Sequence, residues 1–143
     1  MREYKHLLSE SAIWSTVSEF VDAQGNISRG EGQSTIEVTG EQITNDSWID
    51  PPNGRMENKY NIRKISDTRY LYTSQNPALG IQEGYFDVNK DYVFSKFRIE
   101  NTNLNGYEVI RRVDDTCQTS GALYDGNTLV NTWTATMSKM KKG

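Results

Sequence analysis

A strict two-residue alternation near the C-terminus constrains the fold of this chain most. Between residues 129 and 138 one face is mostly apolar, and the other is made of valine, threonine and serine. The more apolar face carries Leu129, Asn131, Trp133, Ala135 and Met137. This pattern is typical of a half-buried antiparallel strand. Asp125-Gly126 lies just before it and predicts a two-residue hairpin turn, with the glycine at positive φ, inside a closing hairpin over residues 119–138.

Similar alternations, separated by turn residues, fill most of the remaining chain. They predict further strands over residues 13–21, 28–38, 42–49, 56–65, 69–75, 81–88, 92–100 and 107–113. The first of these segments could also be a helix, since Ile13, Val17 and Phe20 would share a face, but its serines, threonine and valines favour a strand. Asp50–Gly54 and Asn76–Gly80 carry the clearest loop residues.

Short connections between successive strands favour an up-and-down meander. An open meander of this size would leave two long strand edges in water, and closure into a barrel removes them. The sequence therefore predicts an all-β fold, a single antiparallel up-and-down β-barrel of about eight to ten strands. One domain would cover residues 1–143, with an N-terminal segment over 1–12 that could form a short helical turn and a basic tail over 139–143. A two-sheet sandwich is the alternative.

The composition indicates which partners and which cellular compartment to expect. The formal net charge is −3, so the chain has no general attraction to nucleic acid. A single cysteine, Cys117, excludes an internal disulfide and fits a reducing compartment. No apolar run suits a signal peptide or is long enough to span a membrane. We therefore expect a cytoplasmic protein without a nucleic-acid partner.

The sequence contains few residues that could bind a metal ion or act as a catalytic acid–base pair. One histidine and one cysteine cannot form a His-Cys metal cluster, and no His-based catalytic triad stands out. The turn acids Asp114-Asp115 lack the spacing of a calcium-binding EF-hand loop. We therefore predict no metal site, no cofactor and no catalytic residue.

Arg111 is the most informative polar residue of the predicted strands. Alternation places it on the face of Tyr107, Val109 and Val113, and if this face lines the barrel, the guanidinium needs an anion or an aromatic ring. It could bind a ligand carboxylate, pair with an acid of the barrel, or reach the rim. The predicted ligand-binding residues are Tyr60, Tyr107, Arg111, Asn131, Trp133 and Trp14.

The chain resembles the calycin superfamily of lipocalins and fatty-acid-binding proteins. The shared features are the number of strands, a tryptophan in the first strand (Trp14), a glycine-rich second strand and a tryptophan in the last strand (Trp133). This resemblance implies a barrel with an internal ligand. It also implies another role for Arg111, which would stack on Trp14 as the Arg-Trp pair of lipocalins does.

The chain departs from the patterns of these families at three places. Ala12 stands where lipocalins have a glycine two residues before the first-strand tryptophan. Residues 22–28 leave no room for the two helices of fatty-acid-binding proteins. The histidine, His6, precedes the barrel, whereas the haem-binding barrel called nitrobindin needs an axial histidine late in the chain.

The functional hypothesis from the sequence is binding of a small hydrophobic or amphipathic ligand inside the barrel, with an anionic group if Arg111 is the contact. Two alternatives stay open. One is an enzyme, an isomerase or lyase, that uses the same cavity, although no acid–base pair stands out for it. The other is a protein-interaction module with a filled core.

Overall fold

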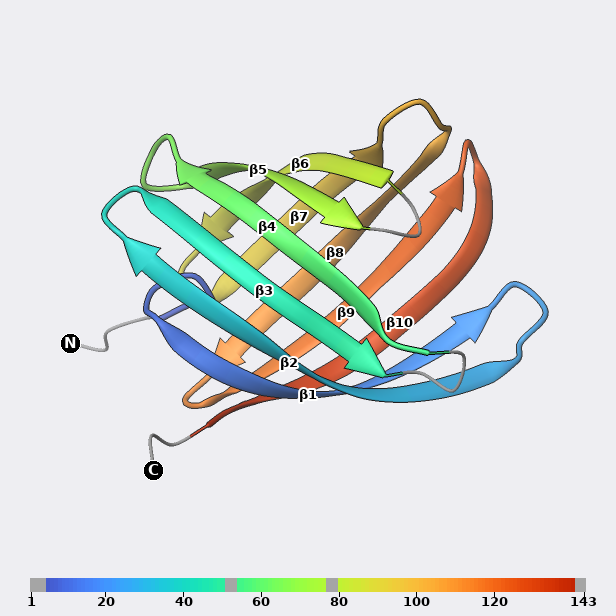
Figure 1. Cartoon of the computed structure of the whole chain (residues 1–143), viewed down its shortest axis with the longest axis horizontal. Coiled ribbons are helices and arrows are strands. Elements are labelled where there is room, and N and C mark those ends of the chain that lie inside the picture. The colour runs from blue at the N-terminus through green and yellow to red at the C-terminus, as the bar shows by residue number, and fades with distance from the viewer. Residues whose placement is uncertain (1–4, 51–53, 77–79, 141–143) are drawn as a thin grey trace.

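Ten strands follow one another along the chain, and each pairs antiparallel with its neighbours in sequence (Figure 1). The structure is a computed structural model that describes residues 5–50, 54–76 and 80–140. The strands are β1 (Ala12–Asp22), β2 (Ile27–Thr39), β3 (Gln42–Asp50), β4 (Met56–Lys64), β5 (Arg69–Asn76), β6 (Gly80–Asn89), β7 (Tyr92–Ile99), β8 (Leu104–Val113), β9 (Thr116–Asp125) and β10 (Thr128–Lys139).

Closure of the sheet comes from the pairing of the last strand with the first. β10 pairs antiparallel with β1, with Trp14 opposite Lys139 and Phe20 opposite Trp133. Among the ten described strands this pairing leaves no unpaired edge, because the β-sheet hydrogen bonds then run around the whole barrel. The predicted all-β, up-and-down barrel is confirmed, and β1 is a strand rather than a helix.

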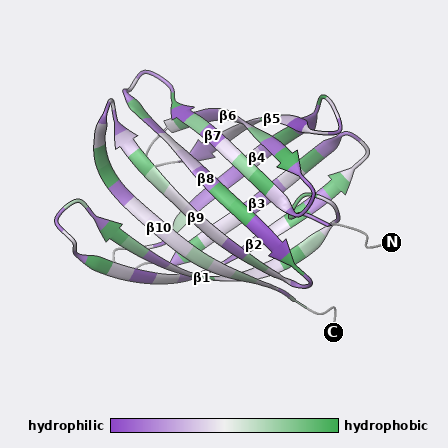
Figure 2. Ribbon diagram, turned by 180° about the vertical axis from the view of Figure 1, so that it is seen from behind, coloured by the Kyte–Doolittle hydropathy of each residue, from purple (hydrophilic) through white to green (hydrophobic). Residues whose placement is uncertain are grey.

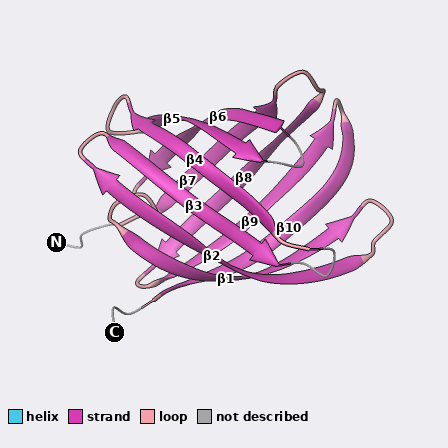
Figure 3. Ribbon diagram, viewed as in Figure 1, coloured by secondary structure: helices cyan, strands magenta, loops and turns pink. Residues whose placement is uncertain are grey.

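Some predictions fall on segments outside the described residues. These segments are 1–4, the loop residues 51–53 and 77–79, and residues 141–143 of the predicted basic tail. In the described part of the N-terminal segment the chain makes a turn, in which the Ser9 amide donates to the His6 carbonyl at 3.1 Å. Figure 3 shows strands and loops but no helix in the part of the chain that is drawn in colour. Accordingly, none of the described residues forms a helix long and apolar enough to cross a membrane.

The packed core lies at the end of the barrel where β1 begins, which we call the N-terminal end. Leu7 and Leu8 cover this end, and Trp14 beneath them is fully buried. The other buried members of this core are Ile36, Ile43, Ile62, Tyr70, Tyr72, Phe86, Val88, Val93, Ile110, Cys117 and Met137. Apolar and polar residues alternate along the strands, as Figure 2 shows, so the apolar side chains of each strand can gather inside.

Arg112 fixes the N-terminal segment to the barrel. Its guanidinium is buried and lies over the Trp14 ring, 5.1 Å from the ring centroid. It donates to Glu10 at 3.0 Å and to the Asp114 carbonyl at 2.7 Å. Lys139 also donates to Glu10, at 2.6 Å. These donors hold the pKa of the Glu10 carboxyl down at about 2, with Lys139 as the largest cause, so Glu10 is an anion in the folded protein at neutral pH.

The predicted inward and outward faces are confirmed on β2 and β4. Ile36 and Ile62 are buried, and Val38 and Tyr60 are partly buried beside them. The predicted outward residues are exposed, and they are Arg29, Glu37, Lys59 and Arg63. In both strands the apolar side chains therefore mark the inner face.

The predicted inner face of β8 is wrong. Tyr107 is 46% exposed, and the Arg111 side chain is 53% exposed. The inward residues of β8 are Gly106, Glu108, Ile110 and Arg112. Each face of this strand carries one arginine and at least one apolar residue, so alternation alone defines two faces without saying which is inside. Arg112, one residue later than predicted, makes the contact with Trp14.

The predicted inward orientation of Leu129 is also wrong. The pairing of β10 with β9 shifts between Leu129 and Asn131, which is a β-bulge, and Leu129 is 40% exposed. An extra residue at a bulge reverses the faces on one side of it. The turn before it lies one residue later than predicted, because Asp125 pairs with Thr128 and leaves Gly126 and Asn127 as the loop. Gly126 has the expected positive φ, +59°.

Candidate ligand site inside the barrel

The interior differs between the two halves of the barrel. At the N-terminal end the inward side chains are mostly apolar, with Arg112 as a charged exception. Toward the opposite end, which we call the far end, they are largely polar. Several inward side chains of this far half stay partly exposed: Asn45, Asn58, Tyr60, Glu108, Asn131 and Trp133. Because they point toward the barrel axis, their exposure indicates that side chains do not fill this part of the interior.

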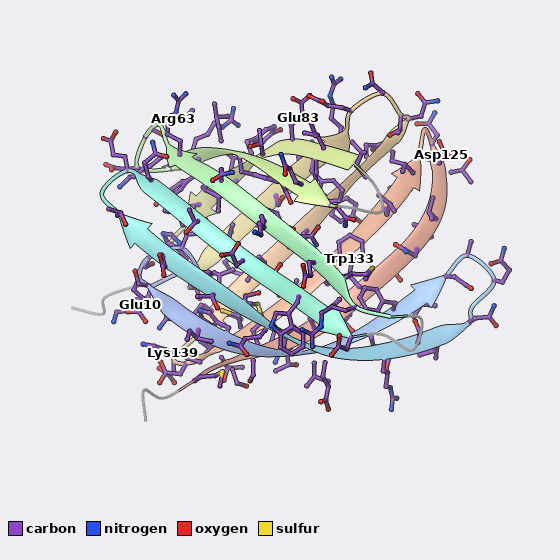
Figure 4. The ribbon with its side chains drawn as sticks, in the orientation of Figure 1. Glu10, Arg63, Glu83, Asp125, Trp133 and Lys139 are labelled. Atoms are coloured by element: carbon purple, nitrogen blue, oxygen red, sulfur yellow. The ribbon has the colours of Figure 1, made fainter. Side chains whose placement is uncertain are left out.

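Trp133, Gly121 and Glu108 form one row across three strands. Trp133 on β10 lies opposite Gly121 on β9, which lies opposite Glu108 on β8. A Cβ atom on Gly121 would lie 2.5 Å from Cζ2 of Trp133, so the indole ring lies directly over the glycine. The ring thereby reaches β8, and its Nε1–H donates to Oε2 of Glu108 at 2.7 Å. In Figure 4 Trp133 lies well away from the end that carries Glu10 and Lys139.

Glu108 is held in an environment that disfavours its charge. Desolvation raises the pKa of its carboxyl, and the hydrogen bond from Trp133 opposes this rise. Among the residues that the structure describes, no basic side chain pairs with it. Tyr60 and Tyr72 face the same interior, and burial is the largest cause of their raised pKa values, with a smaller contribution from the Glu108 charge. The pKa of Tyr72 rises to about 12, so its phenol is neutral at physiological pH.

Replacing Glu108 by glutamine should change how stability depends on pH. The raised pKa means that the folded protein keeps the Glu108 proton at pH values where the unfolded chain, with a value near 4.5, has lost it. The free energy of unfolding of the unsubstituted protein, relative to Glu108→Gln, should therefore fall as pH rises above about 4.5. Urea unfolding of both proteins across this range measures the difference. Glu83→Gln, on the outer face, is the control. If the unfolding free energy of the unsubstituted protein minus that of Glu108→Gln stays constant or rises with pH, the expectation is wrong.

Aromatic side chains from β4, β5 and β6 also line this interior. Tyr60 and Tyr72 have ring centroids 5.6 Å apart, and Tyr72 stacks on Phe86 at 4.4 Å. The Tyr72 hydroxyl lies 3.3 Å from Ser95 Oγ and accepts a hydrogen bond from Gln82 at 3.2 Å. The rings offer an apolar surface, while their hydroxyls stay within a polar network.

Several buried polar atoms around this space have no hydrogen-bond partner in the described structure. They include Oδ1 of three asparagines, Asn45, Asn58 and Asn131, and Oγ1 of Thr16. All four residues are on inward positions of their strands, as the alternation with their buried neighbours shows. An unsatisfied buried carbonyl oxygen costs free energy, so this arrangement suits a site that water or a ligand completes.

The structure brings some of the predicted ligand-binding residues together and separates the rest. Tyr60, Asn131 and Trp133 all face the far half of the interior. Trp14 is inside, but it is fully buried in the apolar core and stacks with Arg112. Tyr107 and Arg111 are on the outer surface and cannot contact a ligand in the barrel. They have outer partners instead, since Tyr107 stacks on Tyr124, and Arg111 donates to Asp91 at 3.2 Å.

Glu108 is the important residue that the sequence analysis missed. The predicted ligand-binding residues Tyr107 and Arg111 are on the other face of the same strand, so their prediction implies an outer position for Glu108. One signal could have identified it. Gly106 precedes Glu108 by two residues on the same face, and glycines inside strands often mark a place where another group approaches closely. A Cβ atom on Gly106 would indeed lie 2.6 Å from the ring of Phe97.

A groove of about 800 Å³ on the outside of the barrel is a second place to consider. It lies across β3 to β7, and its charged lining residues are Arg63, Glu83, Lys96 and Arg98. Arg98 donates to Glu83 at 2.7 Å, and Figure 4 shows Arg63 and Glu83 at the outer edge of the molecule. The charged groups of this groove are solvent-exposed, and it contains none of the unpartnered buried atoms. The interior is therefore the better candidate site.

Comparison with known proteins supports the fold alone. No protein-family model matches this chain, and no curated protein sequence matches it. The crystal structure of Rv2717c from M. tuberculosis superposes with a TM-score of 0.72 at 11% sequence identity, covering 92% of each chain. A second structure, EF1p2_mFAP2b bound to DFHBI, has a TM-score of 0.44 at 11% identity and covers 91% of this chain and 93% of that chain. The first similarity supports the closed barrel, and the second is too weak for an argument.

Proposed function

We propose that this protein binds a small, partly apolar molecule inside the far half of a calycin-type barrel. The observation that carries the proposal is the Trp133–Glu108 pair, which lies in the interior and remains partly exposed. A filled structural core would bury such a pair completely or replace it with apolar side chains, because an interior carboxyl group costs free energy. Partly apolar sites with a few convergent polar groups are typical of small-molecule binding.

The chemistry of this interior changes the expected ligand. Arg111 lies outside, so it provides no contact for an anionic group. Arg112, the inward arginine, is at the N-terminal end and is already occupied by Glu10 and the Asp114 carbonyl. The aromatic rings of Tyr60, Tyr72 and Trp133 offer an apolar contact surface. A small aromatic molecule with a polar group is therefore a suitable probe.

The indole N–H resonances of the three tryptophans provide a direct test. Titration with benzamide, a neutral aromatic amide, should shift the Trp133 indole resonance in a saturable way, because the probe enters next to its hydrogen bond with Glu108. The resonance is assigned by its loss in Trp133→Phe. Trp48 serves as an internal control, since its ring lies outside against Arg55 at 4.1 Å.

The outcome distinguishes ligand binding from the interaction-module hypothesis. A saturable shift at Trp133 with no change at Trp48 supports binding in the interior. If no small aromatic probe shifts the Trp133 resonance at millimolar concentration, the interior is closed to ligands, and the interaction module becomes the better explanation. Equal shifts at both tryptophans would indicate only weak, nonspecific contact.

A further inference from the structure

We infer that the ligand of this interior carries a cationic nitrogen group, such as an amidinium or ammonium, that binds the Glu108 carboxylate beside Trp133. The inference rests on the proposed function and specifies the class of ligand. It follows from the charge of the interior, from the hydrogen-bonding groups that surround it, and from the aromatic rings near the carboxylate.

In the described part of the chain, no basic side chain forms an ion pair with the Glu108 carboxylate. Its Oε2 accepts the hydrogen bond from Trp133, and no described residue donates to its Oε1. The inward arginine is the buried Arg112, at the opposite end of the barrel, where Glu10 and Asp115 neutralise it. A carboxylate in a desolvated site is strongly stabilised by an opposite charge, so a cationic ligand would supply the missing partner.

Three of the unpartnered polar atoms of the described interior are asparagine oxygens. The unpartnered asparagine oxygens of Asn45, Asn58 and Asn131 can only accept hydrogen bonds. A ligand with several N–H groups would therefore complement the site, whereas a carboxylate ligand would place its own acceptors against them. Trp133 and Tyr60 add aromatic rings, and a cation is also attracted to the face of such rings.

The test compares three aromatic probes of nearly the same shape: benzamidine, a cation; benzamide, its neutral analogue; and benzoate, an anion. The shift of the Trp133 indole resonance gives the dissociation constant of each. At pH 8, where a larger fraction of Glu108 is ionised, benzamidine should bind roughly tenfold more tightly than benzamide. Benzoate should bind more weakly than either, because its charge repels that of Glu108.

A matched pair of variants assigns the preference to Glu108. Glu108→Gln keeps the shape of the side chain and an acceptor for Trp133 but removes the charge. It should bind benzamidine and benzamide about equally. Glu83→Gln removes the same charge from the outer face, where Glu83 pairs with Arg98, and should keep the roughly tenfold preference.

A pH titration of the unsubstituted protein gives a second measurement that needs no variant. Benzamidine binding should weaken as pH falls, because protonation of Glu108 removes its charge, while benzamide binding should stay nearly constant. The residues opposite Glu108 on the adjacent strands are Ser95 and Gly121, which do not titrate in this range. Tyr60 and Tyr72, the other titratable groups near it, have raised pKa values and stay neutral.

The outcomes separate this inference from the proposed function. Benzamide and benzamidine of equal affinity would overturn the cationic ligand and leave interior binding intact. Tighter binding of benzoate, or a preference for benzamidine that persists in a folded Glu108→Gln protein, would also overturn it. Failure of all three probes to shift the Trp133 resonance would instead refute the proposed function itself.

Discussion

Substitution of Trp14 by alanine is expected to lower the free energy of unfolding by about 3–5 kcal/mol, as is typical for removing a large buried aromatic side chain. Trp14 is fully buried under Leu7 and Leu8, and its ring supports the Arg112 guanidinium. Its loss would leave a cavity at the N-terminal end and remove the stacking partner of a buried charge. Urea unfolding monitored by circular dichroism measures the change.

Trp48→Ala is the matched control for Trp14→Ala. Trp48 lies on the outer face of β3, where it is partly exposed and contacts Arg55. Loss of this exposed cation–π contact should cost only about 1 kcal/mol. Similar losses for the two variants would show that the N-terminal half of the barrel does not contain the main core.

Substitution of Gly121 by valine is expected to disrupt the candidate site and to destabilise the fold by about 1–3 kcal/mol through overpacking. The added Cβ atom would lie 2.5 Å from Trp133 and 2.6 Å from the Tyr107 carbonyl oxygen, so both the indole and the backbone of β8 must shift, which disturbs the hydrogen bond to Glu108. The Trp133 indole N–H resonance should then shift toward the position of a weaker hydrogen bond, and the response to benzamide should be lost.

Ser120→Val provides the control for Gly121→Val. Ser120 is the preceding residue on β9, it is exposed on the outer face, and a valine fits a strand at such a position. This variant should have nearly unchanged stability and an unchanged Trp133 resonance. A Gly121→Val protein with the same stability and the same resonance would show that the indole does not depend on the space above the glycine.

The strands and the closed barrel could be predicted from local patterns. Alternation over residues 28–38 and 56–65 follows directly from the two-residue period of a strand, and it assigned Ile36 and Ile62 to the core because the opposite faces are charged. Closure followed from the cost of exposed strand edges. The first argument depends on side chains a few residues apart, and the second on the number of strands and the short turns between them, so both need only the sequence.

The candidate site could be predicted only in part. Trp133, Tyr60 and Asn131 were identified because they lie on the mostly apolar faces of their strands. Glu108 and Arg112 were missed because β8 has apolar and charged residues on both faces, so local hydrophobicity does not distinguish them. The prediction for Leu129 is wrong because residue 130, at the bulge, is a valine and not a glycine that would indicate one.

The sequence by itself determined the periodicity, the approximate positions of the turns and the order of the strands, because these depend on residues close together in the chain. Only the tertiary structure decided which face of β8 is inside. That choice depends on contacts between residues far apart in the chain: Arg112 can stack on Trp14 and reach Glu10 only if this face points inward, and the same face then carries Glu108 to Trp133 over Gly121. A shift of one residue in register moves every side chain of a strand to the other side of the sheet. The residues of the site are therefore determined by these long-range contacts and not by the local pattern.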